Sequence, residues 1–210
     1  MIAAVLLAAG NARRFDGSQK LLAPVPRAGG DAPLVRCAAE ALIVAGLERI
    51  VVVLGREADA VGRSLDGLAV RLLINAAYVT GMSSSLRAGV GEAVCLWPAT
   101  EWVLIALGDQ PLAGTGVVEA LARACRGAGR ERATAPQIIA PRFRGEVGNP
   151  VLFARALVPE LLSTSGDRGA RSVVERDPTR VRYVDFAAPA PPDVDTVQDL
   201  AALRESVRRA

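Results

Sequence analysis

Alternating aliphatic runs and helical segments are the feature that most constrains the fold of this chain. Four largely aliphatic runs are each followed within three positions by glycine or a polar residue, as buried strands of a parallel sheet are. They cover Ile2–Leu7, Ile50–Leu54, Ala69–Ile74 and Trp102–Leu107. Helical periodicity fills intervals between and after them, at Pro33–Ala45, Glu57–Leu65, Ser84–Leu96 and Val117–Arg126. This order predicts an α/β fold, a doubly wound, Rossmann-like, mostly parallel sheet with helices on both faces.

The pattern changes after about residue 130. Two short runs, Gln137–Arg142 and Pro150–Phe153, flank residues 143–149 and predict a small β-hairpin insertion. The last elements are predicted as helices at Leu157–Leu162, Ala170–Arg176 and Thr196–Arg208 and a strand at Val181–Phe186. Neither an internal repeat nor a strong domain boundary interrupts the chain, so we expect a single domain over residues 1–210.

Composition argues against several classes of function. The net charge is only +3 and no dense basic run occurs, which disfavours a nucleic-acid partner. Histidine is absent and the three cysteines, Cys37, Cys95 and Cys125, form no CxxC pair, so a zinc site is not expected. Three thiols so far apart in the sequence suit a reducing compartment, so we expect a cytoplasmic protein. The apolar start lacks a basic flank and predicts a buried strand, and no run approaches the roughly 20 residues of a membrane span.

Lysine occurs once, at position 20, among 25 basic residues. Arginine serves as the cation everywhere else, so chance is one explanation for the single lysine. The other is that position 20 needs a compact ammonium charge that a planar guanidinium cannot replace. The position lies in the glycine-containing loop after the first predicted strand, which favours the second explanation.

That loop is a candidate phosphate site. The first strand ends in the small residues Ala8, Ala9 and Gly10, and ligands of open α/β sheets lie at the carboxyl ends of strands. Arg14 and Lys20 follow and would neutralise a triphosphate. Neither GxxxxGK[ST] nor GxGxxG follows the strand, which disfavours a P-loop NTPase or a dinucleotide dehydrogenase. An ordinary surface loop is the alternative.

Three further segments carry candidate chemistry. Asp109 directly follows the strand Trp102–Leu107 and its Gly108, where a carboxylate would suit Mg²⁺; a turn aspartate beside proline is the alternative. Asp193 and Asp195 precede the last predicted helix, as either a second acidic site or a helix cap. The serines of 83–85 stand at a helix start, where hydroxyls either cap the helix or meet a ligand.

Five motifs occur in one order along the chain. They are Leu7-Ala8-Ala9-Gly10 with Arg14 and Lys20, Gly81-Met82-Ser83-Ser84-Ser85-Leu86, Gly108-Asp109-Gln110-Pro111, Gly166-Asp167-Arg168-Gly169-Ala170-Arg171 and Asp193-Val194-Asp195-Thr196. In this order the sequence resembles the MobA-like nucleotidyltransferase family, and within it most closely the molybdenum cofactor cytidylyltransferases. The similarity runs from Ile2 to about Leu203.

The resemblance implies a fold of the nucleotide-diphospho-sugar transferase type. In it, residues 1–130 or so would bind the NTP and about 131–195 the acceptor. Nucleotide contacts are implied for Leu7, Ala8, Ala9, Gly10, Arg14, Lys20, Ser83, Ser84 and Gly108. Acceptor contacts are implied for Asn149, Asp167 and Arg171. Catalysis is assigned to Lys20, Arg14 and Asp109, with Mg²⁺ on Asp109 and Asp195.

The implied reaction transfers a nucleoside monophosphate to the phosphate of molybdopterin and releases pyrophosphate. CTP is the favoured donor because Ala9 stands where relatives that use GTP have glycine. Cytidylyltransferase relatives often carry histidine where this chain has Asn149. Two alternatives are a transferase of the same fold acting on a sugar phosphate or phospho-acid, and a non-catalytic chaperone that binds the cofactor. A molybdenum hydroxylase would receive the product.

Overall fold

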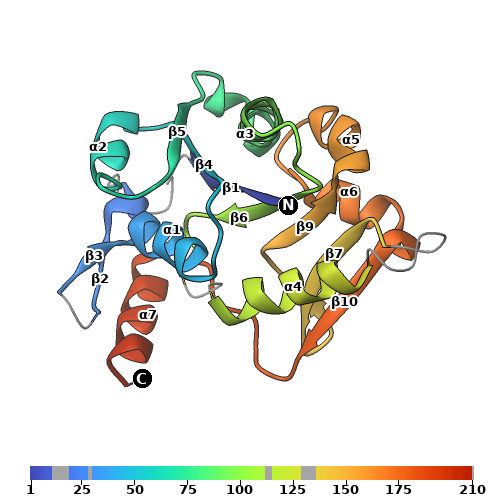
Figure 1. Ribbon diagram of the computed structural model, residues 1–210. Coiled ribbons are helices and arrows are strands. Elements are labelled where there is room, and N and C mark those ends of the chain that lie inside the picture. The colour runs from blue at the N-terminus through green and yellow to red at the C-terminus, as the bar shows by residue number, and fades with distance from the viewer. Residues whose placement is uncertain (11–18, 28–29, 112–114, 129–135, 210) are drawn as a thin grey trace.

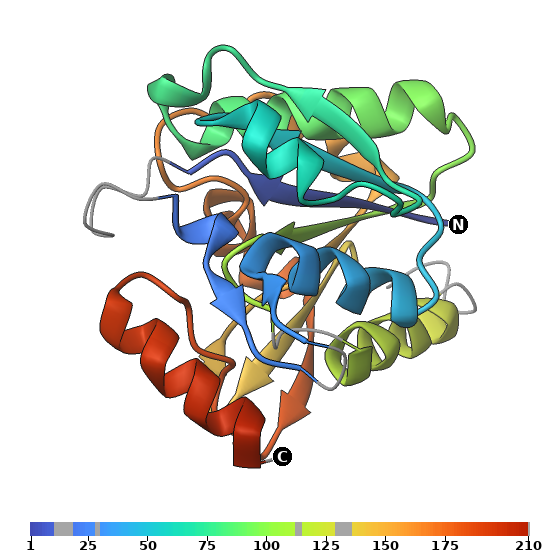
Figure 2. The same ribbon diagram turned by 90° about the vertical axis from the view of Figure 1, so that its left-hand side faces the viewer.

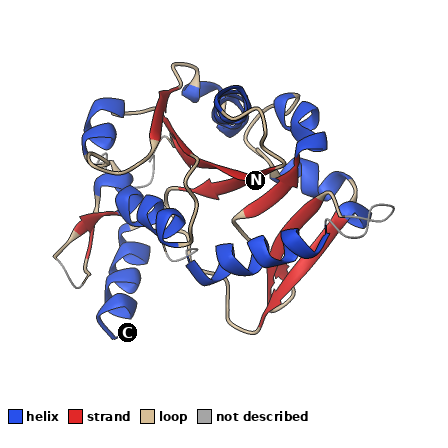
Figure 3. Cartoon of the chain, in the orientation of Figure 1, coloured by secondary structure: helices blue, strands red, loops and turns tan. Residues whose placement is uncertain are grey.

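A continuous β-sheet crosses the molecule and is covered by helices on both faces (Figures 1 and 3). The computed structural model describes residues 1–10, 19–27, 30–111, 115–128 and 136–209. The strand order is β10-β7-β9-β6-β1-β4-β5, with β8 paired to β7. Strands β6, β1, β4 and β5 are parallel neighbours, as are β7 and β10. The predicted mostly parallel sheet with helices on both sides is confirmed.

The strands of this sheet are β1 (Ile2–Ala8), β4 (Ile50–Leu54), β5 (Arg71–Ile74), β6 (Trp102–Leu107), β7 (Ile138–Phe143), β8 (Glu146–Val147), β9 (Val151–Ala154) and β10 (Val181–Phe186). The α-helices are α1 (Leu34–Val44), α2 (Ala58–Arg63), α3 (Met82–Leu96), α4 (Thr115–Ala128), α5 (Val158–Leu162), α6 (Arg171–Arg176) and α7 (Val197–Arg209). Among these described helices, none has the length and apolar content needed to cross a membrane.

Strand β1 lies in the middle of the parallel half and is buried on both faces. Ala4 and Leu6 face a core shared with α1, α2 and α4. Ala3 and Val5 face the opposite core, shared with α3, α5 and α6. Because side chains alternate along a strand, an aliphatic run without polar positions suits a strand that is covered on both sides.

The predicted hairpin insertion is an antiparallel patch in the sheet. Strand β9 runs antiparallel to both β6 and β7, and β8 pairs antiparallel with the end of β7. The segment 143–149 therefore leaves β7, forms the short strand β8 and returns through β9. Its position beside β6 brings residues 145–149 to the edge where the parallel strands end.

A second, two-stranded sheet was not expected from the sequence. Strand β2 (Pro24–Val25) pairs antiparallel with β3 (Ala32–Pro33). Helix α7 packs against it through a small third core made of Ala23, Val25, Leu34, Val194, Leu200 and Leu203. Figures 1 and 2 both show α7 beside this small sheet, away from the covered faces of the large one. The packing carries residues 193–196 back toward the carboxyl end of β6.

Candidate functional site

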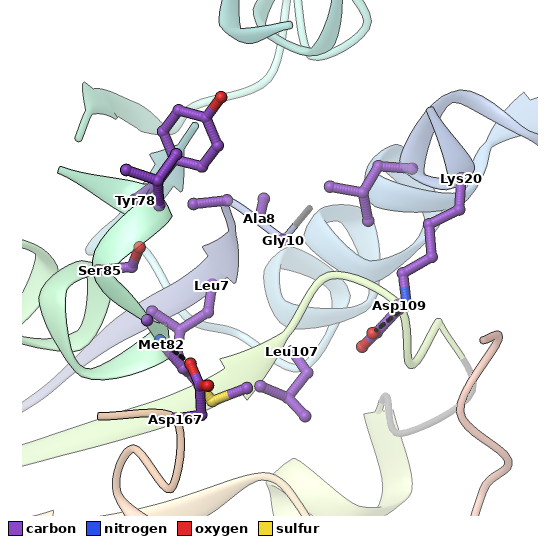
Figure 4. A pocket seen from close by; sticks show the side chains of 14 residues that line it. Leu7, Ala8, Gly10, Lys20, Tyr78, Met82, Ser85, Leu107, Asp109 and Asp167 are labelled. Atoms are coloured by element: carbon purple, nitrogen blue, oxygen red, sulfur yellow. Dashed lines mark hydrogen bonds and ion pairs between the residues drawn. The ribbon is translucent and has the colours of Figure 1, made fainter. Parts of the chain in front are cut away.

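A cavity of about 330 Å³ lies at the carboxyl ends of β1 and β6. Parallel neighbours end at the same edge of a sheet, so the loops that follow them meet there. Figure 4 shows Lys20 and Asp109 meeting on one side of the cavity and Met82 and Asp167 meeting on another. The lining residues are Leu7, Ala8, Ala9, Gly10, Lys20, Leu21, Tyr78, Val79, Gly81, Met82, Ser85, Leu107, Asp109 and Asp167.

Gly108 lets the chain after β6 pass directly over the end of β1. Its backbone amide donates to the carbonyl of Leu7 at 2.9 Å. A Cβ at position 108 would lie 3.2 Å from that same carbonyl oxygen and 3.4 Å from Cβ of Ala8. A side chain here would be tight against the end of β1, so glycine suits the close approach that positions Asp109.

Lys20 joins two carboxylates that are remote from it in the sequence. Its Nζ lies 2.8 Å from Oδ2 of Asp109 and 2.8 Å from Oδ1 of Asp195. The lysine side chain is only 10% exposed, whereas those of Asp109 and Asp195 are 24% and 50% exposed. Burial disfavours the charged lysine, but the two carboxylates outweigh burial and hold the pKa of the ammonium above its usual value.

The segment 193–196 is attached to the turn after β6. The amide of Val194 donates to the carbonyl of Asp109 at 3.1 Å, and Gln110 Nε2 donates to Oδ1 of Asp193. Burial raises the pKa of the Asp193 carboxyl, while that hydrogen bond opposes the rise. These contacts hold Asp195 at the cavity edge.

Thr196 caps helix α7, and this leaves the Asp195 side chain for Lys20. The Thr196 amide donates to Oδ2 of Asp199 at 2.8 Å, and the Asp199 amide donates to Oγ1 of Thr196 at 3.1 Å. This reciprocal pair is the arrangement of a capping box. The helix cap is therefore Thr196, and neither Asp193 nor Asp195 is needed for that role.

The start of helix α3 is capped by the loop 166–167. The amide of Met82 donates to Oδ1 of Asp167 at 3.3 Å, and the amide of Ser83 donates to the carbonyl of Gly166 at 3.0 Å. Gly81 has φ +112°, and a Cβ there would lie 2.7 Å from Oδ1 of Asp167. The two first amides of the helix thus have protein partners.

The three serines of α3 have different environments. Ser84 Oγ accepts from Asn75 Nδ2 at 2.9 Å and lies 2.9 Å from the carbonyl of Gly81. Ser83 Oγ is buried without a hydrogen-bond partner in the described part of the chain. Ser85 lines the cavity, although the sequence pointed to Ser83 and Ser84. Asn75, which directly follows β5, also donates to Ser85 Oγ at 3.0 Å, and its polar side chain after a strand was the available signal.

A larger cavity of about 770 Å³ adjoins the first, and the two share Leu7, Met82, Leu107 and Asp167. All three predicted acceptor residues line it: Asn149, Asp167 and Arg171. Its apolar lining residues include Ile105, Val151, Phe153, Val174 and Tyr183. Three further polar residues line this cavity: Arg168, which belongs to the motif 166–171 but was not predicted as an acceptor residue, and Glu146 and Glu175, which the sequence did not single out.

The guanidiniums in the lining of the larger cavity share one carboxylate. Arg171 Nε donates to Oε1 of Glu175 at 2.8 Å, and Arg168 Nη2 donates to Oε2 of the same residue. These donations from Arg171 and Arg168 hold the pKa of the Glu175 carboxyl below its usual range. All three side chains are open to solvent, so an anionic ligand can compete for the two arginines.

The remaining predicted site features are the second cation, Arg14, and the metal ligands. Arg14 lies outside the described residues. Within those residues, no group of three or more histidine, cysteine, aspartate and glutamate side chains could hold a metal ion. The carboxylates that converge are Asp109 and Asp195, with Lys20 between them.

Comparison with known proteins agrees with this architecture. The chain is 32% identical over 204 residues to nicotine blue oxidoreductase of Paenarthrobacter nicotinovorans, with 96% of each chain covered. Rv0371c from Mycobacterium tuberculosis H37Rv is similar in structure, with a TM-score of 0.78, 26% identity and 97% of each chain covered. A structure of Rv0371c in complex with manganese also matches, with a TM-score of 0.76 and 26% identity over 97% of each chain.

A nucleotidyl transferase from Methanothermobacter thermautotroptrophicus shares the fold, with a TM-score of 0.79, 23% identity and coverage of 100% of this chain and 98% of that one. The family model described as the MobA-like NTP transferase domain matches residues 4–181. That match spans most of the large sheet and all lining residues of the two cavities except Tyr183. The chain therefore belongs to the MobA-like nucleotidyltransferase family, as the resemblance predicted.

Proposed function

We propose that this chain transfers a nucleoside monophosphate, with CTP as the favoured donor, to the phosphate of a molybdopterin-type acceptor and releases pyrophosphate. The observation that carries the proposal is the junction of the two cavities. One contains Lys20 and Asp109, the other contains the predicted acceptor residues, and the two share four lining residues. Transfer between two phosphates requires both substrates side by side, which adjoining cavities provide.

The smaller cavity suits the nucleotide. Its floor is the small-residue end of β1, where Ala8, Ala9 and Gly10 let a ligand approach the backbone. Lys20 brings a positive charge to one side and would hold phosphate oxygens there. Arg14 remains a predicted second cation. Ala9 lines this cavity where relatives that use GTP have glycine, and its methyl group would crowd a purine base more than a pyrimidine.

A divalent cation fits the chemistry of the carboxylate pair. Oδ2 of Asp109 and Oδ1 of Asp195 converge on one cationic centre, the Lys20 ammonium, and carboxylate oxygens are the ligands that Mg²⁺ and Mn²⁺ prefer. Asp109 and Asp195 would hold the ion. When bound, it would neutralise charge on the phosphates. The manganese complex of Rv0371c supports a divalent metal in the family.

The larger cavity suits a planar heterocycle that carries an anion. Phe153, Tyr183 and Val174 contribute apolar lining, against which the hydroxyls of a sugar would lose hydrogen bonds to water. Asn149 can donate to and accept from ring atoms. Arg168 and Arg171 supply positive charge for an anionic group.

The proposal is tested by pyrophosphate release with a panel of NTPs and acceptors, molybdopterin and sugar phosphates among them, in Mg²⁺ or Mn²⁺. Turnover should require CTP and molybdopterin. Asp109→Asn should lower it by roughly 100-fold or more because a charged metal ligand becomes neutral. Asp59→Asn, at an exposed position of helix α2, makes the same chemical change away from the site and should leave turnover unaltered. Turnover of Asp109→Asn near that of the wild type would refute the assignment.

Lys20→Arg tests the role of the single lysine in the same assay. The guanidinium keeps the charge but cannot occupy the narrow space between two carboxylates and then reach phosphate oxygens as a point charge. We expect a loss of roughly tenfold or more in rate. A variant as active as the wild type would show that position 20 needs only a positive charge.

A redox reaction is the second candidate, favoured by the 32% identity to nicotine blue oxidoreductase over 96% of both chains. The larger cavity, with Val151 and Phe153 of β9 in its lining, would then receive nicotine blue. Nicotine blue offered together with a reduced nicotinamide nucleotide, without NTP, distinguishes the two candidates. Consumption of the reductant together with the absence of pyrophosphate release would favour the redox function.

A further inference from the structure

In the Lys20–Asp109–Asp195 cluster one ammonium charge offsets only one of two carboxylate charges, and it stands where a metal ion would enter. The lysine nitrogen is equally close, 2.8 Å, to an oxygen of each carboxylate, which is where an ion held by both oxygens would have to interact. An ammonium and a divalent cation cannot occupy this space together, because both need the same oxygens and repel each other.

We propose that Lys20 is an internal placeholder for the divalent cation. This inference rests on the proposed function of the same site. The ammonium holds the two carboxylates until a metal ion displaces it, and the displaced ammonium then turns into the smaller cavity. Free metal must compete with Lys20, whereas metal that arrives with a triphosphate offers the ammonium new oxygen partners. Metal and nucleotide therefore bind cooperatively.

The backbone around Lys20 is fixed, so the exchange needs only side-chain rotation. Leu22 N donates to Gln19 O and Ala23 N donates to Lys20 O, each at 3.0 Å, and Leu21 is buried in the core beneath β1. The Gln19 side chain donates to the carbonyl of Arg56 at 2.9 Å. The four-carbon stem of Lys20 can then swing about an anchored Cα.

The carboxylates are anchored independently of the lysine. The carbonyl of Asp109 accepts from the Val194 amide, and the Asp195 amide donates to Oδ2 of Asp199 at 3.1 Å. When the ammonium leaves, the backbones of Asp109 and Asp195 therefore stay in place, and both carboxylate oxygens become available to a metal ion. The cavity that Lys20 already lines provides the space into which its ammonium turns.

The single lysine makes the exchange directly measurable in the wild-type protein. Lys20 and the amino group of Met1 are the amines of this sequence that acetic anhydride can acetylate, and mass spectrometry of the peptides quantifies each separately from acetylated thiols and phenols. The Lys20 amine should react slowly without metal, since its side chain is 10% exposed and paired twice. Saturating Mn²⁺ alone should raise its rate at least roughly fivefold, because the amine loses the carboxylates that favour its charged form, and Mn²⁺ with a non-hydrolysable CTP analogue should lower it again. Met1, paired with Glu101 at the opposite edge of the sheet, is the internal control and should not respond.

Calorimetric titration of Mn²⁺ without nucleotide provides the second measurement. Lys20→Met should bind Mn²⁺ at least roughly tenfold more tightly than the wild type, while Arg71→Met, which removes an exposed charge elsewhere, should bind as the wild type does. Mn²⁺ that binds without changing the Lys20 acetylation rate would overturn the inference. The inference would also be overturned if Lys20→Met bound Mn²⁺ no more tightly than the wild type, or if Arg71→Met gained as much Mn²⁺ affinity as Lys20→Met. Neither measurement depends on turnover, so failure of the proposed reaction would be seen separately.

Discussion

Gly89, inside helix α3, is predicted to tolerate no side chain, and substitution by alanine tests how closely that helix is packed on the sheet. A Cβ at position 89 would lie 2.4 Å from Cγ1 of Val5 and 2.6 Å from Cγ2 of Val53. Both valines are fully buried, on neighbouring strands β1 and β4. Ordinary carbon contacts are about 3.5–4.0 Å, so the overlap exceeds roughly 1 Å on both sides.

The expected magnitude follows from two opposed effects. Alanine in place of a helical glycine stabilises by about 1 kcal/mol through propensity. Overpacking of this kind costs about 1–3 kcal/mol, because β-branched valines in paired strands have no alternative rotamer or backbone position. Gly91→Ala is the matched control: it lies in the same helix and its added Cβ would meet nothing within 4 Å. We expect Gly89→Ala to be less stable than Gly91→Ala by roughly 1–3 kcal/mol.

Urea unfolding followed by circular dichroism measures this difference. The slope with denaturant should be unchanged and only the midpoint should move. In a thermal scan the two variants should differ by roughly 2–12 °C for a domain of this size. A Gly89→Ala protein that is as stable as Gly91→Ala would mean that α3 stands farther from β1 and β4 than described.

Two further predictions concern groups with displaced pKa values. Arg180, which donates to Glu160 at 2.7 and 3.2 Å, and Arg176 hold the pKa of the Glu160 carboxyl below its usual range. Glu160→Gln should therefore destabilise the protein by about 1 kcal/mol at pH 7. In urea titrations the difference should begin to shrink below the ordinary glutamate pKa of about 4.3 and vanish once the pH has passed below the lowered folded pKa, because the carboxylate stabilises only while ionised. Burial raises the pKa of the Cys125 thiol to about 11, whereas Cys95 is exposed. At pH 8.5 about 0.3% of Cys125 is thiolate, so iodoacetamide should label Cys95 at least roughly tenfold faster, and preferential labelling of Cys125 would contradict the burial.

Much of the fold was predictable because strand and helix periods differ along the chain. The aliphatic run at Ile2–Leu7 could belong only to an element covered on both faces, and β1 is such a strand. The start of α3 was predicted at Ser84 but lies at Met82, because Asp167 and Gly166 accept from its first amides. Those partners are more than 80 residues away, beyond the reach of any local pattern.

The small sheet of β2 and β3 was missed for a related reason. Each strand has only two residues and contains proline, so neither carries a period. Their stability comes from the third core, in which Val25 and Leu34 pack with Val194 and Leu200 from the end of the chain. No local property of residues 24–33 indicates that contact.

The candidate site, like the fold, was predictable from the sequence only in part. Convergence of Lys20 and Asp109 followed from the rule that parallel strands end at one edge. Which serine faces the cavity could not follow, since residues 83–85 are successive positions on a helix and differ by about 100° in direction. Gly89, one turn after Ser85 on the same helix, packs against Val5 and Val53, and these contacts with distant strands restrict the rotation of α3.

The position of Asp195 connects the third core with the charge cluster around Lys20. The sequence suggested that the NTP is bound by about residues 1–130 and the acceptor by about 131–195, yet Lys20 is held by one carboxylate from each part. Asp195 reaches the nucleotide side because α7 packs on β2 and β3, which directly follow Lys20 along the chain. The third core and the charge cluster are therefore coupled: the core brings the second carboxylate, and the lysine compensates the repulsion between the two acids. Loosening α7 should weaken the hold on Lys20 before it affects the large sheet, whose cores contain none of the described α7 side chains.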